Sequence, residues 1–293
     1  MDKFCLICKL LCGLCLVSSM VCGQSLLRAD SLLRENNYAL AAVYYEKALF
    51  EQSTQPIVSV EAYRVLQNNL LHKKIQCQKS LRVFEEAWET AQRFDLNELN
   101  DTLTFKYRYE TTLCGYLSGH YEEAYGQLQQ TRYYVQDTTL TEGLKIIEIM
   151  LLNELGHWEE SKAAFRKYAA QNQLFLDVDN LYREVKKKPK SADKAQLLSF
   201  IFPGLGQVYA GYPAKGIVSM GLQAFALSFG VYHVWHRYYF IGFFTGAGLF
   251  QSFYFGGARR AGIMAEETNR KRKARHNQKM RSLLVDTENK KRK

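Results

Sequence analysis

The chain has little proline and lacks the short motifs of common catalytic and nucleotide sites. Four prolines in 293 residues leave long stretches free to form helices, because proline interrupts an α-helix. No GxSxG sequence is present, and no glycine-rich loop ends in the Lys-Ser/Thr pair that a phosphate-binding loop requires. We therefore expect a non-enzymatic protein with no catalytic residue, no metal ligand and no cofactor.

Acidic side chains are scarce in the last third of the chain. Residues 24–185 hold 17 lysine and arginine residues against 23 acidic ones, whereas residues 186–293 hold 20 against 5. The basic part also holds the long apolar runs, and basic residues beside such runs are typical of membrane topology signals and of contact with anionic lipid. We expect membrane lipids as partners and no nucleic acid, which would require a basic surface on a soluble fold.

Only two of the seven cysteines lie beyond residue 23. Residues 1–23 combine a short charged start, an apolar run and small residues before Gln24, which is typical of a secretory signal peptide. An uncleaved membrane anchor is the alternative interpretation. Either one predicts that the following segment is exported from the cytoplasm.

Four stretches of the exported segment share a helical spacing. In each, an aromatic residue is followed three positions later by a small one, and the aromatic residues are 46, 37 and 37 positions apart. A period in this range, with two amphipathic helices per unit, predicts a helical solenoid. The pairs are Tyr38/Ala41, Phe84/Ala87, Tyr121/Ala124 and Trp158/Ser161.

This repeat, strongest in GHYEEA and GHWEES, resembles the tetratricopeptide repeat, and we assign residues 24–185 to it. The resemblance implies antiparallel helix pairs with a concave face that binds a protein or peptide partner. A helical domain with coincidental spacing is the alternative. Cys77 and Cys114 occupy equivalent places in adjacent units, about 8–10 Å apart and beyond the reach of a disulfide, so we expect two buried free thiols.

The repeat register also predicts which side chains line the concave face. Positions at fixed distances before each aromatic residue form a mixed polar and aromatic set that suits a peptide or a protein segment. A solvated helix face is the alternative interpretation. The predicted partner-binding residues are His72, Gln76, Lys79, Tyr109, Tyr116 and Asn153.

Two apolar runs near the C-terminus are long enough to cross a bilayer. Residues 217–235 and 238–257 contain no acidic side chain, and about 20 apolar residues span a bilayer as a helix. Only His236 and Arg237 separate the runs, which predicts a tight helical hairpin. Small residues at three- or four-residue spacings predict close contact between its two helices.

A glycine-rich segment, residues 195–216, precedes the hairpin and follows a basic linker at residues 186–194. Over residues 195–265 the pattern resembles the glycine-aromatic signature of TM-two-type membrane hairpin domains and of a related domain of bacterial envelope proteins. We interpret its glycines as tight-turn and close-packing positions rather than as a binding site. The motif residues are Pro203, Gly204, Gly206, Gln207, Tyr209, Gly211, Lys215 and Gly216.

The predicted architecture is all-α, with a signal peptide, a tetratricopeptide-like solenoid, a C-terminal transmembrane hairpin and a basic tail at residues 266–293. The resemblance implies an envelope protein of Gram-negative bacteria, held in the inner membrane with its repeat domain in the periplasm. The alternative is an accessory role in membrane-protein biogenesis or transport, with a membrane-helix partner or as a homo-oligomer. Residues 195–211 either cross the bilayer, which would place the tail in the cytoplasm as we expect, or form an interfacial element.

Overall fold

The computed structural model describes residues 23–291, so residues 1–22 of the predicted signal peptide lie outside the described part of the chain. Residues 23–291 are helical and contain no strand, which confirms the all-α class. The chain divides into two compact units. The N-terminal unit ends at Ala164, and the C-terminal unit begins at Phe165.

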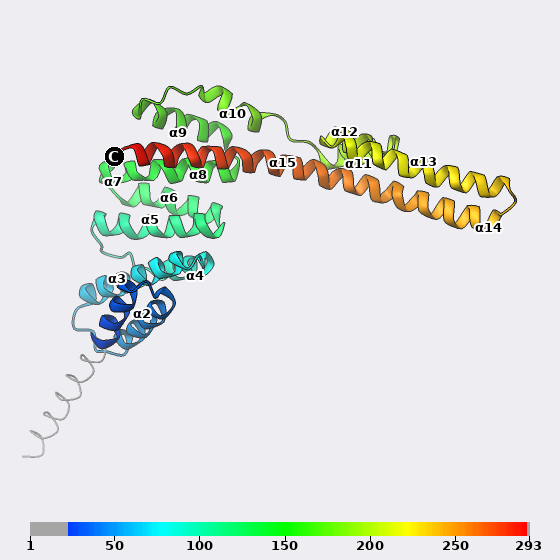
Figure 1. Ribbon diagram of the computed structural model, residues 1–293. Coiled ribbons are helices and arrows are strands. Elements are labelled where there is room, and N and C mark those ends of the chain that lie inside the picture. Colours follow the sequence, from blue (N-terminus) through cyan, green and yellow to red (C-terminus); the bar gives the residue numbers. More distant parts are fainter. Residues whose placement is uncertain (1–22, 292–293) are drawn as a thin grey trace, which may run out of the picture. The chain divides into compact units, whose positions relative to one another are not determined.

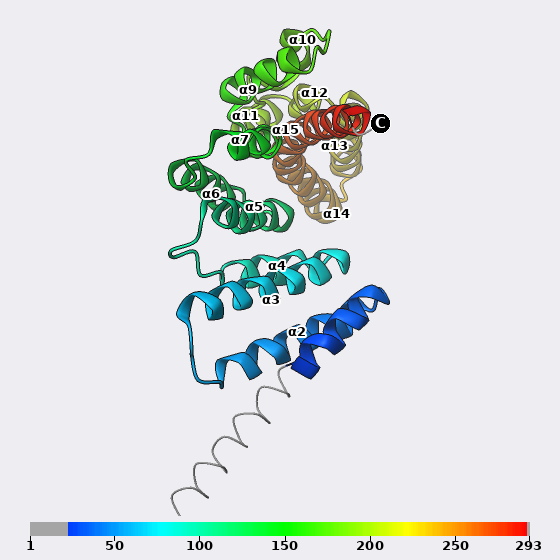
Figure 2. The same cartoon turned by 90° about the vertical axis from the view of Figure 1, so that its left-hand side faces the viewer.

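Successive helices of the N-terminal unit lie beside one another in chain order (Figure 1, Figure 2). Each helix from α2 to α5 packs on the next one along the chain, and residues 23–34 are helical as well. The bounds are α2 Tyr38–Ser53, α3 Val60–Ser80, α4 Phe84–Ala91, α5 Asp101–Ser118, α6 Tyr121–Tyr134, α7 Thr138–Thr141, η1 Glu142–Leu144, α8 Lys145–Leu155 and α9 Trp158–Gln171, which continues into the C-terminal unit.

The repeated aromatic residues mark the starts of helices. The first residues of α2, α4, α6 and α9 are Tyr38, Phe84, Tyr121 and Trp158. The small residue three positions later is fully buried in every case, and a short side chain there lets two helices pack closely. These small residues are Ala41, Ala87, Ala124 and Ser161.

The two cysteines of this unit are free and fully buried, as predicted. They belong to different core clusters, Cys77 beside Tyr45 and Cys114 beside Trp88. Burial raises the pKa of the Cys77 thiol to about 11 and that of the Cys114 thiol to about 12, because an apolar surrounding penalises the thiolate. Both thiols therefore act as small packing residues.

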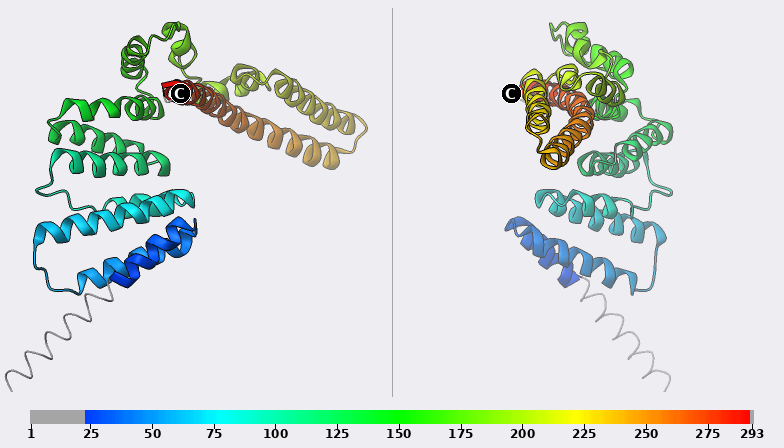
Figure 3. Two further views of the ribbon diagram at one scale, coloured as in Figure 1. Left: turned by 60° about the vertical axis from the view of Figure 1, so that its left-hand side comes forward. Right: turned by 90° about the vertical axis from the view of Figure 1, so that its right-hand side faces the viewer.

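The C-terminal unit contains a long helical hairpin. Two helices, α13 and α15, run side by side and are joined through a turn and the short helix α14 (Figure 1, Figure 3). A pair of short helices lies near the open end of this hairpin and packs on α15. The bounds are α10 Val178–Lys186, α11 Ala192–Ile201, α12 Leu205–Ala210, α13 Pro213–Trp235, α14 Tyr239–Ile241, η2 Gly242–Ala247 and α15 Gly248–Lys291.

One helix in the described part of the chain, α13, is long and apolar enough to cross a membrane. The second predicted span is not one regular α-helix, and that expectation is corrected. It begins as α14, continues as the π-helical turn η2 and then enters α15. The π-helical turn brings Gly246 against Gly230 of α13, where an added Cβ would overlap the backbone. Close backbone contact therefore replaces regular helix geometry at this point.

Residues 195–211 fold back on themselves and form two short helices. The chain turns at Pro203 and Gly204, and α12 then lies against α11. A Cβ at Gly206 of α12 would overlap the carbonyl oxygen of Ala195 in α11, which shows how closely the two helices approach. The segment is therefore not one continuous helix, because Gly204 has a φ of +88° and reverses the chain direction.

The basic tail is helical and continues α15 without a break. The imidazole of His276 packs on the ring of Tyr182 in α10, with ring centroids 4.7 Å apart. The hydroxyl of Tyr168 donates to the Glu288 carboxylate at 2.7 Å. The tail therefore lies beside residues 168–182 of its own unit.

Candidate functional site

Gln207 joins four helices in the C-terminal unit. Its side chain is 2% exposed, and its amide nitrogen donates to the Gly257 carbonyl of α15 at 3.0 Å and to the Ser219 hydroxyl of α13 at 3.5 Å. Its amide oxygen accepts from the Ser199 hydroxyl of α11 at 3.3 Å. We call these four residues the Gln207 site. A buried amide that is satisfied on three sides fixes the relative positions of its helices.

The motif glycines near Gln207 in the sequence occupy tight turns and close helix contacts. Gly204 and Gly216 face each other, and a Cβ on Gly216 would lie 2.7 Å from the Gly204 carbonyl oxygen. Gly211 ends α12 with a φ of +99°, which side chains with a Cβ adopt at a cost. These positions serve chain reversal and close packing.

The linker binds to the same motif through Lys190. Its ammonium donates to the Tyr209 carbonyl at 2.8 Å, and its backbone exchanges two hydrogen bonds with the Asn269 side chain of α15. The Tyr209 hydroxyl accepts from the backbone of Ser191 at 3.2 Å. Tyr209 of the motif therefore positions the linker. Its fellow motif residue Pro203 lies in the turn between α11 and α12.

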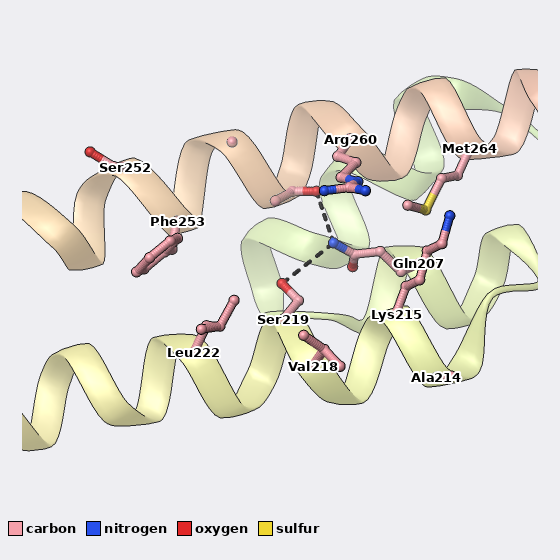
Figure 4. A pocket seen from close by; sticks show the side chains of 12 residues that line it. Gln207, Ala214, Lys215, Val218, Ser219, Leu222, Ser252, Phe253, Arg260 and Met264 are labelled. Atoms are coloured by element: carbon pink, nitrogen blue, oxygen red, sulfur yellow. Dashed lines mark hydrogen bonds between the residues drawn. The ribbon is translucent and has the colours of Figure 1, made fainter.

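A cavity of about 530 Å³ opens beside the Gln207 site, between α13 and α15. Figure 4 shows its lining: Lys215 of α13 and Arg260 of α15 lie near Gln207 at one end. Leu222 and Phe253 lie at the other end. The cavity is thus cationic at one end and apolar at the other.

In the N-terminal unit, three of the predicted groove residues gather around Glu110 of α5. Lys79 pairs with this carboxylate, and His72 Nε2 lies 3.8 Å from it. Gln76 is exposed and its amide lies 3.5 Å from His72 Nδ1. Burial lowers the pKa of His72, while the Glu110 charge opposes this shift. We call these four residues the Glu110 surface.

The other three predicted groove residues lie elsewhere. Tyr116 is 8% exposed and packs on Tyr121 with ring centroids 5.8 Å apart. Asn153 is 1% exposed and accepts from the Ser161 hydroxyl at 2.8 Å. The prediction of a surface role is therefore corrected for Tyr116 and Asn153, because both face helix contacts of their own unit. Tyr109 is half-buried and packs beside Phe105.

Several contributing residues were not predicted from the sequence. Glu110 neighbours the predicted Tyr109, and its spacing from helix α3 is set only by the tertiary packing. In the sequence, Ser219 is one of several small residues in the first predicted span, and Arg260 is one of several basic residues that follow the second. Among residues 23–291, no three His, Cys, Asp or Glu side chains lie close enough to bind a metal ion together.

Both sites depend on contacts between segments that lie far apart in the sequence. Gln207 and Gly257 are 50 residues apart in the chain, so their hydrogen bond belongs to the tertiary fold. Comparison with known protein families, with curated proteins and with solved structures found no match to this chain.

Proposed function

We propose that this chain is a non-enzymatic membrane protein of the bacterial envelope. Its N-terminal unit is a tetratricopeptide-like solenoid that binds a protein or peptide partner. Its C-terminal hairpin anchors the chain in the inner membrane. The N-terminal unit then lies in the periplasm after export by the signal peptide. Because the hairpin then crosses the membrane twice, the basic tail lies on the same side of the membrane as α10.

The exposed apolar surface of the hairpin carries the membrane part of this proposal. Long apolar side chains of α13 and η2 face outward, and soluble monomers rarely expose a continuous apolar surface of this kind. The polar groups of Gln207 and Gln223 face inward instead, as expected for helices in lipid. The exposed side chains include Ile217, Val218, Phe225, Val231, Phe243 and Phe244, each at least 60% exposed.

The Glu110 surface supports the partner-binding part. It combines a cation, an imidazole, an amide and a carboxylate within one region of α3 and α5. The Glu110 carboxylate is buried and holds Lys79 and His72, whereas the exposed Gln76 amide can both donate to and accept from the backbone of an extended peptide or a partner helix. The partly exposed Lys79 and the exposed Gln76 are the side chains that a partner would reach first.

A charge placed on the hairpin tests the membrane location. Phe225 on α13 is 64% exposed and Phe50 on α2 is 70% exposed, so the two positions are matched in residue type and exposure. In water, Phe→Arg at either position should change stability by at most about 0.5 kcal/mol. In a bilayer, Phe225→Arg costs about 3 kcal/mol of insertion free energy.

The measurement is recovery of full-length chain from alkaline-washed membranes of a bacterial host. We expect wild type and Phe50→Arg in the washed membranes, and Phe225→Arg strongly reduced there. Equal recovery of both variants from the soluble fraction would contradict the membrane proposal.

The accessory role in biogenesis or transport, through the hairpin itself, has less support. Only some of the small residues of the hairpin are used inside it, because Gly221, Ala224 and Ser228 of α13 are exposed. Gly230, Gly242 and Gly246 contact one another's backbone across α13 and η2. We place partner recognition on the N-terminal unit because of the exposed Gln76 and the partly exposed Lys79 of the Glu110 surface.

A further inference from the structure

We propose that the cavity beside the Gln207 site binds one anionic phospholipid. The headgroup phosphate lies between Lys215 and Arg260, and an acyl chain follows the apolar end of the cavity. This inference rests on the proposed membrane location and extends it, because it assigns a selective lipid site to named residues.

The shape of the cavity fits an amphipathic ligand. Its volume of about 530 Å³ lies within the range of about 300–1,000 Å³ that is usual for ligand pockets. One end presents the cations of Lys215 and Arg260, and the other presents Val218, Leu222 and Phe253 (Figure 4). A lipid has the same division between a charged head and an apolar chain.

The cavity extends along α13 from its cationic end to its apolar end, which is the direction from headgroups to acyl chains when the hairpin spans a bilayer. Lys215 lies in the first turn of α13, and Arg260 follows the predicted second span, so both cations lie at the open end of the hairpin. Headgroups lie at this level when the hairpin spans the membrane. Leu222 is seven residues further along α13, which is about 10 Å deeper at 1.5 Å per residue. The acyl chain would therefore run toward the bilayer centre.

The charges at the cavity mouth favour an anion. Both side chains are exposed, and among the described residues neither forms an ion pair with a carboxylate. The Lys215 ammonium lies 4.8 Å from the centre of the Tyr212 ring, which positions it. The acidic neighbour Glu267 pairs with Lys271 at 2.7 Å, and Lys271, with a smaller contribution from Lys215, lowers the pKa of its carboxyl group. Arginine and lysine together suit a phosphate, because the guanidinium can donate two parallel hydrogen bonds.

Gln207 shapes the wall of this site and does not hold the ligand. Its amide already donates hydrogen bonds to Gly257 and Ser219 and accepts one from Ser199. The two cations therefore determine selectivity for charge, and the apolar end determines that the ligand is a lipid.

The test measures lipid binding by the full-length chain purified in mild detergent. Native mass spectrometry follows titration with phosphatidylglycerol, and separately with phosphatidylcholine. The double variant Lys215→Gln/Arg260→Gln removes both cations, and Arg259→Gln/Arg270→Gln is the control with the same charge change at exposed positions that do not line the cavity. Leu222→Trp fills the apolar end and leaves both charges in place.

We expect wild type and the control to hold one phosphatidylglycerol in preference to phosphatidylcholine. The cavity double variant should bind it about thirtyfold more weakly, from the usual contribution of two cations near anionic lipid. Leu222→Trp should also lose it. Equal binding by both double variants, or equal binding of the two lipids by wild type, would overturn the site alone while the chain still enters membranes. A chain found only in the soluble fraction, without bound lipid, would overturn the membrane proposal as well.

Discussion

Replacing Gln207 by leucine removes a polar side chain that forms hydrogen bonds to α11, α13 and α15. Leucine has a similar size and suits an apolar surrounding, so the change tests the hydrogen bonds rather than the packing. The Ser199 hydroxyl, at 2% exposure, would lose its hydrogen bond to the amide oxygen. We expect α12 to separate more easily from the hairpin.

The magnitude follows from three hydrogen bonds. Each contributes about 1 kcal/mol in a water-soluble protein and about 0.6 kcal/mol between membrane helices. The distances of 3.3 and 3.5 Å to the two serine hydroxyls are long, and the 3.0 Å bond to the Gly257 carbonyl is the strongest. Gln207→Leu should therefore cost about 2 to 3 kcal/mol of local opening free energy.

Hydrogen–deuterium exchange of the chain in detergent micelles measures this local opening. Amides of α12 should exchange about thirty to one hundred and fifty times faster in Gln207→Leu than in wild type. Gln251→Leu is the matched control, because this glutamine is exposed on α15 of the same hairpin. If the two variants exchange α12 amides at the same rate, Gln207 does not hold the four helices together and the argument is refuted.

Three further predictions concern packing, pH and thiols. Gly246→Ala should lower the unfolding free energy of the hairpin by about 1–3 kcal/mol, because the added Cβ overlaps α13. Gly248→Ala is the control and should leave this free energy unchanged, because no heavy atom lies within 4 Å of its added Cβ. Denaturation in mixed micelles measures both. Burial lowers the pKa of His276 from 6.5 to about 4 in the folded state, so the stability it contributes is complete above pH 6.5 and is lost on acidification towards pH 4. At pH 5 the loss is about 2 kcal/mol, and the same pH titration with His276→Gln should lack this component; equal slopes would contradict it. Cys77 and Cys114 should react with a thiol reagent only after unfolding without reductant, and a thiol count below two would contradict their free state.

Local sequence patterns predicted the elements that depend on local chemistry. The aromatic-to-small spacing predicted helices at Tyr38 and Tyr121, because a buried face recurs with the period of the helix itself. The glycines of the motif were correctly interpreted as packing positions. In the first case the cause lies within a few residues of the pattern, whereas the glycines pack on residues of neighbouring helices such as Ala195.

Features that depend on distant contacts were not predictable in the same way. The packing of α12 against α11 depends on the close contact between Gly206 and the backbone of Ala195. From the sequence alone, the apolar segment at residues 195–211 fits a kinked membrane span equally well. Tyr116 and Asn153 were assigned to the wrong face because a helix in a stack has two covered sides. Only the neighbouring helices determine which of its polar residues stay exposed.

In the proposed function, the N-terminal unit binds a protein partner while the hairpin holds the chain in the membrane. Site-specific photo-crosslinking in intact bacteria tests it most directly, with the photoreactive residue at exposed Gln76 of the Glu110 surface or at exposed Glu123 of α6 as the control. We predict a discrete adduct with one other protein from Gln76, recovered in the membrane fraction, and none from Glu123. No adduct from Gln76, or the same adducts from both positions, would contradict the account.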